Sequence, residues 1–261
     1  MNSISRMGRP QSHSLYQKIA SGKKLHSAAN GAAALSIAKK QESQVRGYNA
    51  GTNNLRSGQY LLNVSDGALG GVSDYLQRIR ELAIQASNTA VVTDSDRANI
   101  QKEIEQMKQG ISDIASQTQF NTKNLLDGSS ANGLNIAADS NGSSIKINGS
   151  ADATLKALGI ADFDVTKDFD LNAIDVALDK VSSQRSTGGA QYNRLGHARD
   201  YNSYASYNTS ASRSRLEDTD YPKAVSDLKK KQALSTYSFM MQKRKMQDAT
   251  RNAQNFWLKM S

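Results

Sequence analysis

The sequence predicts a mainly α-helical protein: an elongated bundle of long antiparallel helices with coiled-coil-like seams, plus a small β-hairpin region. Two stretches carry apolar residues at alternating three- and four-residue spacing, the pattern that buries one face of a helix against a partner. Only 2 of the 261 residues are proline, which suits long helices because proline interrupts a helix interior. The chain has no cysteine, so disulfides and thiolate metal sites are excluded.

The first seam lies in the N-terminal third. Positions 62, 65, 69, 72, 76, 79, 83 and 86 hold Leu, Ser, Leu, Val, Leu, Ile, Ala and Ala. We predict a helix over about 47–88, which would be about 60 Å long at 1.5 Å per residue. Such a rod cannot be buried inside a compact globule, so it needs neighbouring helices that run alongside it.

A second seam follows after a polar stretch. Either Thr93 or Asp94 is suited to cap the start of this helix, and the residues rich in Asn, Ser and Gly over 123–133 predict that it ends near Asn121. The seam positions keep the three-four spacing: Ile100, Ile104, Met107, Ile111, Ile114 and Thr118.

Residues 134–160 differ in character from the seams. Two short segments, 134–136 and 144–148, alternate apolar and polar residues around a turn that contains Gly142, which predicts a β-hairpin. Helical spacing returns with Leu171, Ile174, Leu178 and Val181. We therefore expect a helix that returns along the first two in a bundle.

Charge is distributed unevenly along the chain, whose formal net charge is +9. Residues 1–47 contain eight Lys or Arg and one acidic residue, and residues 222–261 contain nine and two. The middle of the chain is therefore acidic. Basic ends leave nucleic-acid binding by a coiled-coil protein as an alternative interpretation. Since no segment approaches about 20 consecutive apolar residues, we expect no membrane insertion.

Several motifs together identify a resemblance to the bacterial flagellins, in the right order and at near-family spacing. They are Ser21-Gly-Lys-Lys-Leu25, Asp66-Gly-Ala-Leu69, the helix Leu76–Asn88, Gln117-Thr-Gln-Phe-Asn121 with Leu125-Leu-Asp-Gly128, and Ser212–Tyr221. The chain is similar to a short flagellin that lacks the outer variable domains.

The resemblance implies five regions, four of which build the helical parts. We expect an N-terminal polymerisation segment over 1–46, short for the family, and a C-terminal one over 216–261. Between them we expect an N-terminal helical core over 47–128, a β-hairpin or variable region over 129–169, and a C-terminal core helix over 170–215.

The function that the resemblance implies is that of a structural subunit of the bacterial flagellar filament, extracellular and exported without a cleaved signal peptide. Its expected partners are other flagellin subunits and a flagellar export chaperone. Alternatives are a flagellin-like accessory, either a minor flagellin or a hook–filament junction protein, and, third, the basic nucleic-acid-binding coiled coil. With nucleic acid not among the expected partners, the filament subunit is the leading hypothesis.

One recognition surface also follows from the resemblance. In many flagellins the first core helix and the next one bind the innate immune receptor TLR5, and the matching positions here are Arg78, Leu82, Gln85 and Glu103. The first three lie at spacings of four and three on one helix face. They are off the seam at 76, 79 and 83, so we expect them to be exposed.

Enzymatic activity is not expected. The sequence shows no nucleophile–base pair, no cofactor loop and no His-Glu-x-x-His motif. We therefore predict no catalytic residues, no metal site and no cofactor.

Overall fold

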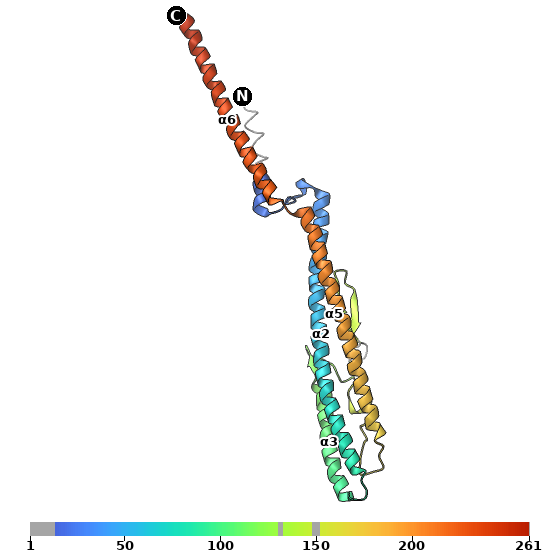
Figure 1. Cartoon of the computed structure of the whole chain (residues 1–261). Coiled ribbons are helices and arrows are strands. Elements are labelled where there is room, and N and C mark those ends of the chain that lie inside the picture. Colours follow the sequence, from blue (N-terminus) through green and yellow to red (C-terminus); the bar gives the residue numbers. More distant parts are fainter. Residues whose placement is uncertain (1–13, 130–132, 148–151, 261) are drawn as a thin grey trace. The chain divides into compact units, whose positions relative to one another are not determined.

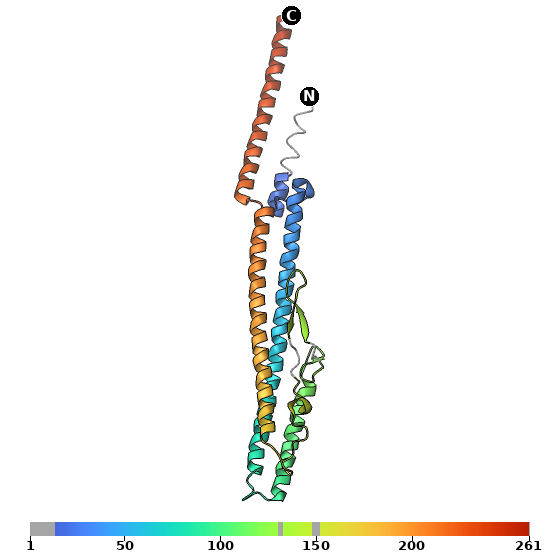
Figure 2. The same cartoon turned by 90° about the vertical axis from the view of Figure 1, so that its right-hand side faces the viewer.

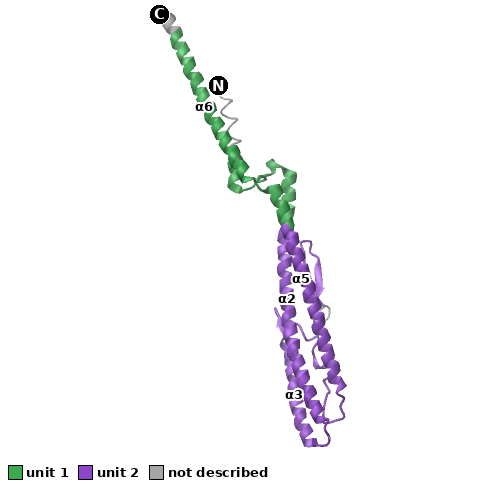
Figure 3. Ribbon diagram, viewed as in Figure 1, with its two compact units in different colours: residues 1–43, 208–261 green, residues 44–207 purple. Residues whose placement is uncertain are grey.

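The computed structural model describes residues 14–129, 133–147 and 152–260. It divides into two compact units (Figure 3). Unit 1 comprises Met1–Ser43 and Asn208–Ser261, and unit 2 comprises Gln44–Tyr207. The mainly α-helical class is confirmed, because long helices dominate both units and the strands are few and short.

The longest element is helix α2, Ala32–Ala86. It begins 15 residues before the predicted start at 47, in an alanine-rich stretch that favours a helix intrinsically. It ends close to the predicted residue 88, where the Ser87 hydroxyl donates a 2.9 Å hydrogen bond to the carbonyl of Ala83. The backbone N–H of Ser87 donates to the same carbonyl at 3.0 Å, so both groups of Ser87 close the last turn of the helix.

Helix α3, Asp94–Gln117, follows after a short connection. Thr93 is its N-cap residue. This was one of the two predicted capping residues, the other being Asp94. The Thr93 hydroxyl accepts from the backbone N–H of Asp96, and the Asp96 carboxylate accepts from the backbone N–H of Thr93, which completes a capping box. The helix ends four residues before Asn121.

The cap of α3 makes its stability dependent on pH. The hydroxyl and backbone N–H of Thr93 hold the pKa of Asp96 below its ordinary value. A carboxyl group whose pKa is depressed by folding stabilises the protein at pH values above its pKa in the unfolded state. This stabilisation is lost as the pH falls through its pKa in the folded state. We expect Asp96→Asn to lower the melting temperature at pH 7, and the gap to the parent to close below about pH 4.

Thermal melts of the parent and the Asp96→Asn variant, followed by circular dichroism at pH 7 and at pH 3, test this prediction. Thr93→Ala should lower stability by about 1 kcal/mol through loss of the N-cap. In that background Asp96→Asn should have little further effect, because both substitutions break the same box. A gap between parent and Asp96→Asn that is equal at pH 7 and pH 3 would contradict the assignment.

Helix α5, Asn172–Glu217, returns antiparallel to α2 and lies beside it in both views (Figures 1 and 2). Within unit 2, ion pairs join the two helices at Arg80–Asp175, 2.6 Å, and at Asp66–Arg185, 2.8 Å. Helix α3 lies along another side of α2, where a side chain added at Gly71 would lie 3.2 Å from Ile114. Unit 2 is therefore a three-helix bundle, as the two seams and the returning helix predicted.

The predicted β-hairpin is confirmed as strands β3, Leu134–Ala137, and β4, Ser144–Ile147, paired antiparallel. The sequence did not reveal a second, two-residue pair, β1, Gln119–Phe120, with β2, Lys123–Asn124. Nor did it reveal the short helix α4, Leu155–Leu158, which the Thr154 hydroxyl caps.

The hairpin rests on glycines of α2. A side chain at Gly47 would meet the backbone of Ser140, one at Gly51 the carbonyl of Ala138, and one at Gly58 the side chain of Ile136. The Asn202 amide of α5, which is only 2% exposed, donates to the same Ala138 carbonyl. Close approach of backbone to backbone is a place where only glycine fits.

The core of unit 2 runs the length of the bundle and continues under the loops that join its helices. Its largest fully buried side chains come from all three helices and from the β region: Leu55, Leu76, Ile79, Ile104, Ile111, Leu125, Leu126, Ile147, Leu158, Ile160, Ile174 and Leu195. Five of the eight first-seam positions, 62, 69, 72, 76 and 79, are large and buried, so the three-four spacing marks a real interface.

Unit 1 contains a helical stretch over 14–21, the short 3-10 helix η1, Ala28–Asn30, and helix α6, Tyr221–Met260. An extended crossing links its two chain segments. The backbone N–H of Thr219 donates to Gly22, and that of Lys24 donates to Glu217. The Lys23 ammonium lies 2.6 Å from the Glu217 carboxylate, whose side chain is only 4% exposed.

Candidate recognition surfaces

Helices α2 and α3 of unit 2 bring two of the predicted receptor residues, Arg78 and Glu103, into contact. The Arg78 guanidinium donates to Glu103 of α3 at 2.7 and 3.1 Å, and to Glu81 on its own helix at 3.0 Å. The hydrogen bonds that Arg78 donates to Glu103, and next the one that it donates to Glu81, raise the pKa of Arg78 above its ordinary value. Arg78 and Glu103 keep 49% and 43% of their side chains exposed.

Leu82 corrects one expectation. Arg78 and Gln85 are exposed as expected, and Glu103 is exposed too, but Leu82 is only 2% exposed and belongs to the core. Helix α3 covers a second stripe of α2, beside the first seam, that includes Gly71, Tyr75 and Arg78. Leu82 continues that second stripe at a spacing of four from Arg78, so it is buried against α3.

Helix α6 of unit 1 presents a different surface. Most of its side chains beyond Lys231 are exposed, among them large apolar ones. Leu234, Tyr237, Met240 and Met241 are 58%, 64%, 62% and 38% exposed. Because Leu234, Tyr237 and Met241 recur at spacings of three and four, they form a stripe on one helix face. We call Leu234, Tyr237, Met240 and Met241 together the α6 stripe.

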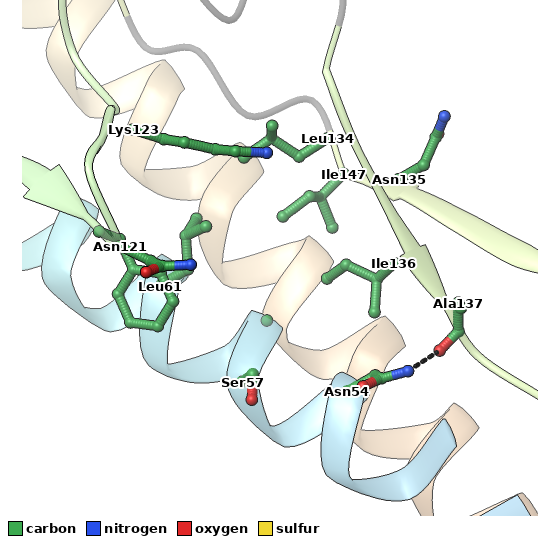
Figure 4. Close-up of a pocket in the computed structure, with 12 residues that line it drawn as sticks. Asn54, Ser57, Leu61, Asn121, Lys123, Leu134, Asn135, Ile136, Ala137 and Ile147 are labelled. Atoms are coloured by element: carbon green, nitrogen blue, oxygen red, sulfur yellow. Dashed lines mark hydrogen bonds between the residues drawn. The ribbon is translucent and has the colours of Figure 1, made fainter. Parts of the chain in front are cut away.

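A pocket of about 370 Å³ lies between α2 and the strands of unit 2 (Figure 4). Its walls are apolar, with Leu61, Phe120 and Ile136 among them, and its rim carries amides. One of these, Asn54, donates a 3.1 Å hydrogen bond to Ala137 and so fixes β3 to α2. The pocket therefore lies where the hairpin packs against the helical bundle.

The described part of the chain contains no candidate metal site and no candidate membrane span. No group of three or more His, Asp or Glu side chains there could hold a metal ion. None of the helices in the described residues is both long and apolar enough to span a membrane.

Comparison with known proteins gives the class that this fold and these helical surfaces define. Residues 3–131 match the model of the bacterial flagellin N-terminal helical region, and residues 171–251 match that of the C-terminal helical region. The chain is 32% identical to a flagellin of Bacillus subtilis over 284 aligned residues, with 92% of both chains covered. It is 34% identical to a flagellin of Halalkalibacterium halodurans, covering 88% of this chain and 86% of the relative.

A solved structure shares the fold. It is that of a provisionally identified flagellar hook-associated protein from Vibrio parahaemolyticus, with a TM-score of 0.59 and 16% identity, covering 72% of this chain and 100% of the other. The chain belongs to the bacterial flagellin family. Flagellins are structural proteins of the flagellar filament, and the relatives named here set this chain among filament subunits.

Proposed function

We propose that this chain self-associates into the extracellular flagellar filament through its terminal segments, 1–46 and 216–261, and through its core helices. The observation that supports this is the α6 stripe. A helix in water does not gain from exposing Leu234, Tyr237 and Met240, since burying each large apolar side chain is worth about 1.5–3 kcal/mol. Neighbouring subunits would provide that burial.

Electron microscopy after salt-induced polymerisation tests the proposal, with the protein alone and seeded with a full-length flagellin. Filaments in the unseeded sample support self-association. Filaments only in the seeded sample favour the accessory function, a minor flagellin or a hook–filament junction protein. Absence of filaments in both samples contradicts incorporation altogether. Leu234→Ser with Met240→Ser should abolish assembly, while Val91→Ser, at an exposed loop position of unit 2, should not.

The same stripe suits the export chaperone that we propose as a cytoplasmic partner, with export of the chain occurring without a cleaved signal peptide. Methionine side chains are flexible and adapt to more than one partner. Met240 and Met241 could therefore pack first against a chaperone and then against other subunits. Competition between chaperone and seeded assembly would report this exchange.

We further propose that the innate immune receptor TLR5 recognises the exposed surface formed by Arg78, Gln85 and Glu103. Arg78 and Glu103 offer charge-assisted hydrogen bonds, and arginine is enriched among residues that dominate binding energy. In this conformation Leu82 would not contact the receptor. It would support the surface by packing α2 against α3.

Arg78→Ala is expected to weaken receptor binding about 30-fold or more, the effect of losing a dominant contact. Surface plasmon resonance with the receptor ectodomain measures it. Arg56→Ala, at an exposed position of the same helix, is the matched control and should leave affinity unchanged. Melting curves should be similar for both variants, because the Arg78 ion pairs are exposed. Unchanged affinity for Arg78→Ala would remove this surface from the proposal.

A further inference from the structure

Helix α6 carries two basic triplets that flank the α6 stripe. Lys229, Lys230 and Lys231 precede it, and Lys243, Arg244 and Lys245 follow it. The triplets are 14 residues apart, which is about 21 Å along a helix axis. Five of the six side chains are exposed, and that of Lys231 is half-buried. The helix thus presents an exposed apolar patch bounded at both ends by positive charge.

Assembly explains the apolar patch but not the triplets. Copies of α6 that pack side by side in register would bring like charges together, and like charges in contact are unfavourable. The two acidic residues of 222–261, Asp227 and Asp248, are too few to balance nine basic ones. In the described part of the chain, no carboxylate forms an ion pair with Lys243, Arg244 or Lys245. The triplets therefore fit an anionic partner.

The combination of charge and apolar residues identifies the kind of partner. A lipid bilayer with anionic headgroups offers a plane of negative charge directly above an apolar layer. Lysine and arginine can reach the headgroups with their charged ends while their stems lie along the apolar patch. Tyrosine is a residue that favours this boundary, and Tyr237 is 64% exposed in the centre of the patch. A nucleic acid offers the charge without an apolar layer.

We propose that α6 of the unassembled protein binds the surface of anionic membranes, lying in the interface without spanning the bilayer. The basic triplets provide electrostatic attraction, and the α6 stripe enters the boundary between headgroups and acyl chains. This role goes beyond the filament function, because it concerns the free subunit and a lipid partner.

Vesicle flotation with the full-length chain tests the proposal at about 150 mM salt, where weak exposed charge pairs are screened. The vesicles are pure phosphatidylcholine, or phosphatidylcholine with about 30 mol% phosphatidylglycerol. We expect the chain to float only with the anionic vesicles. Replacing all six triplet residues with Gln should lower partitioning at least tenfold, and so should Leu234→Ser with Tyr237→Ser and Met241→Ser.

Matched controls keep the composition equal. The charge control neutralises six exposed basic residues of unit 2, namely Arg56, Lys102, Lys123, Lys156, Lys167 and Arg194. The apolar control is Tyr60→Ser with Val91→Ser and Tyr204→Ser, all exposed in unit 2. Both controls should float like the parent.

Two outcomes would overturn the proposal. Flotation that survives the six Gln substitutions would show that the triplets do not recognise the headgroups. Flotation that survives the Ser substitutions, together with equal affinity for a DNA duplex, would show a general attraction to polyanions. Both results are independent of filament formation, because polymerisation is assayed without vesicles.

Discussion

Gly51→Ala is expected to lower the free energy of unfolding of unit 2 by about 2–3 kcal/mol. The added methyl group would overlap the carbonyl oxygen of Ala138 and lie 2.7 Å from its carbon and 3.0 Å from the Asn202 amide. These obstacles are backbone and a buried side chain, so relief requires moving the hairpin away from α2. Overpacking of this kind costs about 1–3 kcal/mol, and a lost Asn202 hydrogen bond adds about 1 kcal/mol.

The substitution has an opposing effect that a control can isolate. Alanine is favoured over glycine inside a helix by about 1 kcal/mol. Gly67 lies on the same helix and a methyl group there would meet nothing within 4 Å. Gly67→Ala should therefore stabilise unit 2 by about 0.5–1 kcal/mol. Urea unfolding followed by circular dichroism measures both variants, and a stabilising Gly51→Ala would show that the hairpin does not rest against α2.

Lys23→Met is the second large expected effect, and it falls on unit 1. The Glu217 carboxylate is almost fully enclosed, and its 2.6 Å partner is the Lys23 ammonium, with Arg213 more distant at 3.8 Å. Removing Lys23 leaves a buried charge with a poorer partner, which costs about 2 kcal/mol or somewhat more. The substitution should open the crossing between residues 22–24 and 217–219.

Hydrogen exchange and limited proteolysis at that crossing measure the second effect. Faster exchange is expected at the N–H groups of Lys24 and Thr219, with the exchange of unit 2 unchanged. Lys39→Met is the matched control, because the Lys39–Glu42 pair is an exposed one within a single helix, and such pairs contribute about 0.3–0.5 kcal/mol. Equal protection of the crossing in both variants would contradict the role of Lys23.

The sequence predicted the parts of the fold that bury one face against one partner. A seam appears in the sequence only where a helix has such a face, and this is why Leu76 and Ile79 were identified. Residues 32–46 belong to α2 but bury little, with Ala38 the one buried position there, so no periodicity marked them. Leu82 was misplaced because a single seam does not reveal a second helix on another side of α2.

The short elements lacked a signal for a related reason. The turn between β1 and β2 uses Asn121 and Thr122 at φ values of 49° and 64°. Asparagine tolerates this region, but threonine is a rare occupant, so local turn chemistry did not predict it. In contrast, the β3–β4 turn contains Gly142 at a φ of 82°. Glycine is the residue expected at such a φ, so the sequence predicted this turn.

The antiparallel pairing of α2 with α5 has a consequence for folding kinetics. Its contacts join residues very distant in sequence: Asp66 with Arg185, 119 residues apart, and Asn49 with Ser206, 157 apart. Loops of this length close slowly, and high contact order slows folding. A nascent chain cannot complete this pairing until its C-terminal third is available. We therefore expect the interval between synthesis and a closed bundle to be long. During that interval the chain stays unfolded and can pass through a narrow channel.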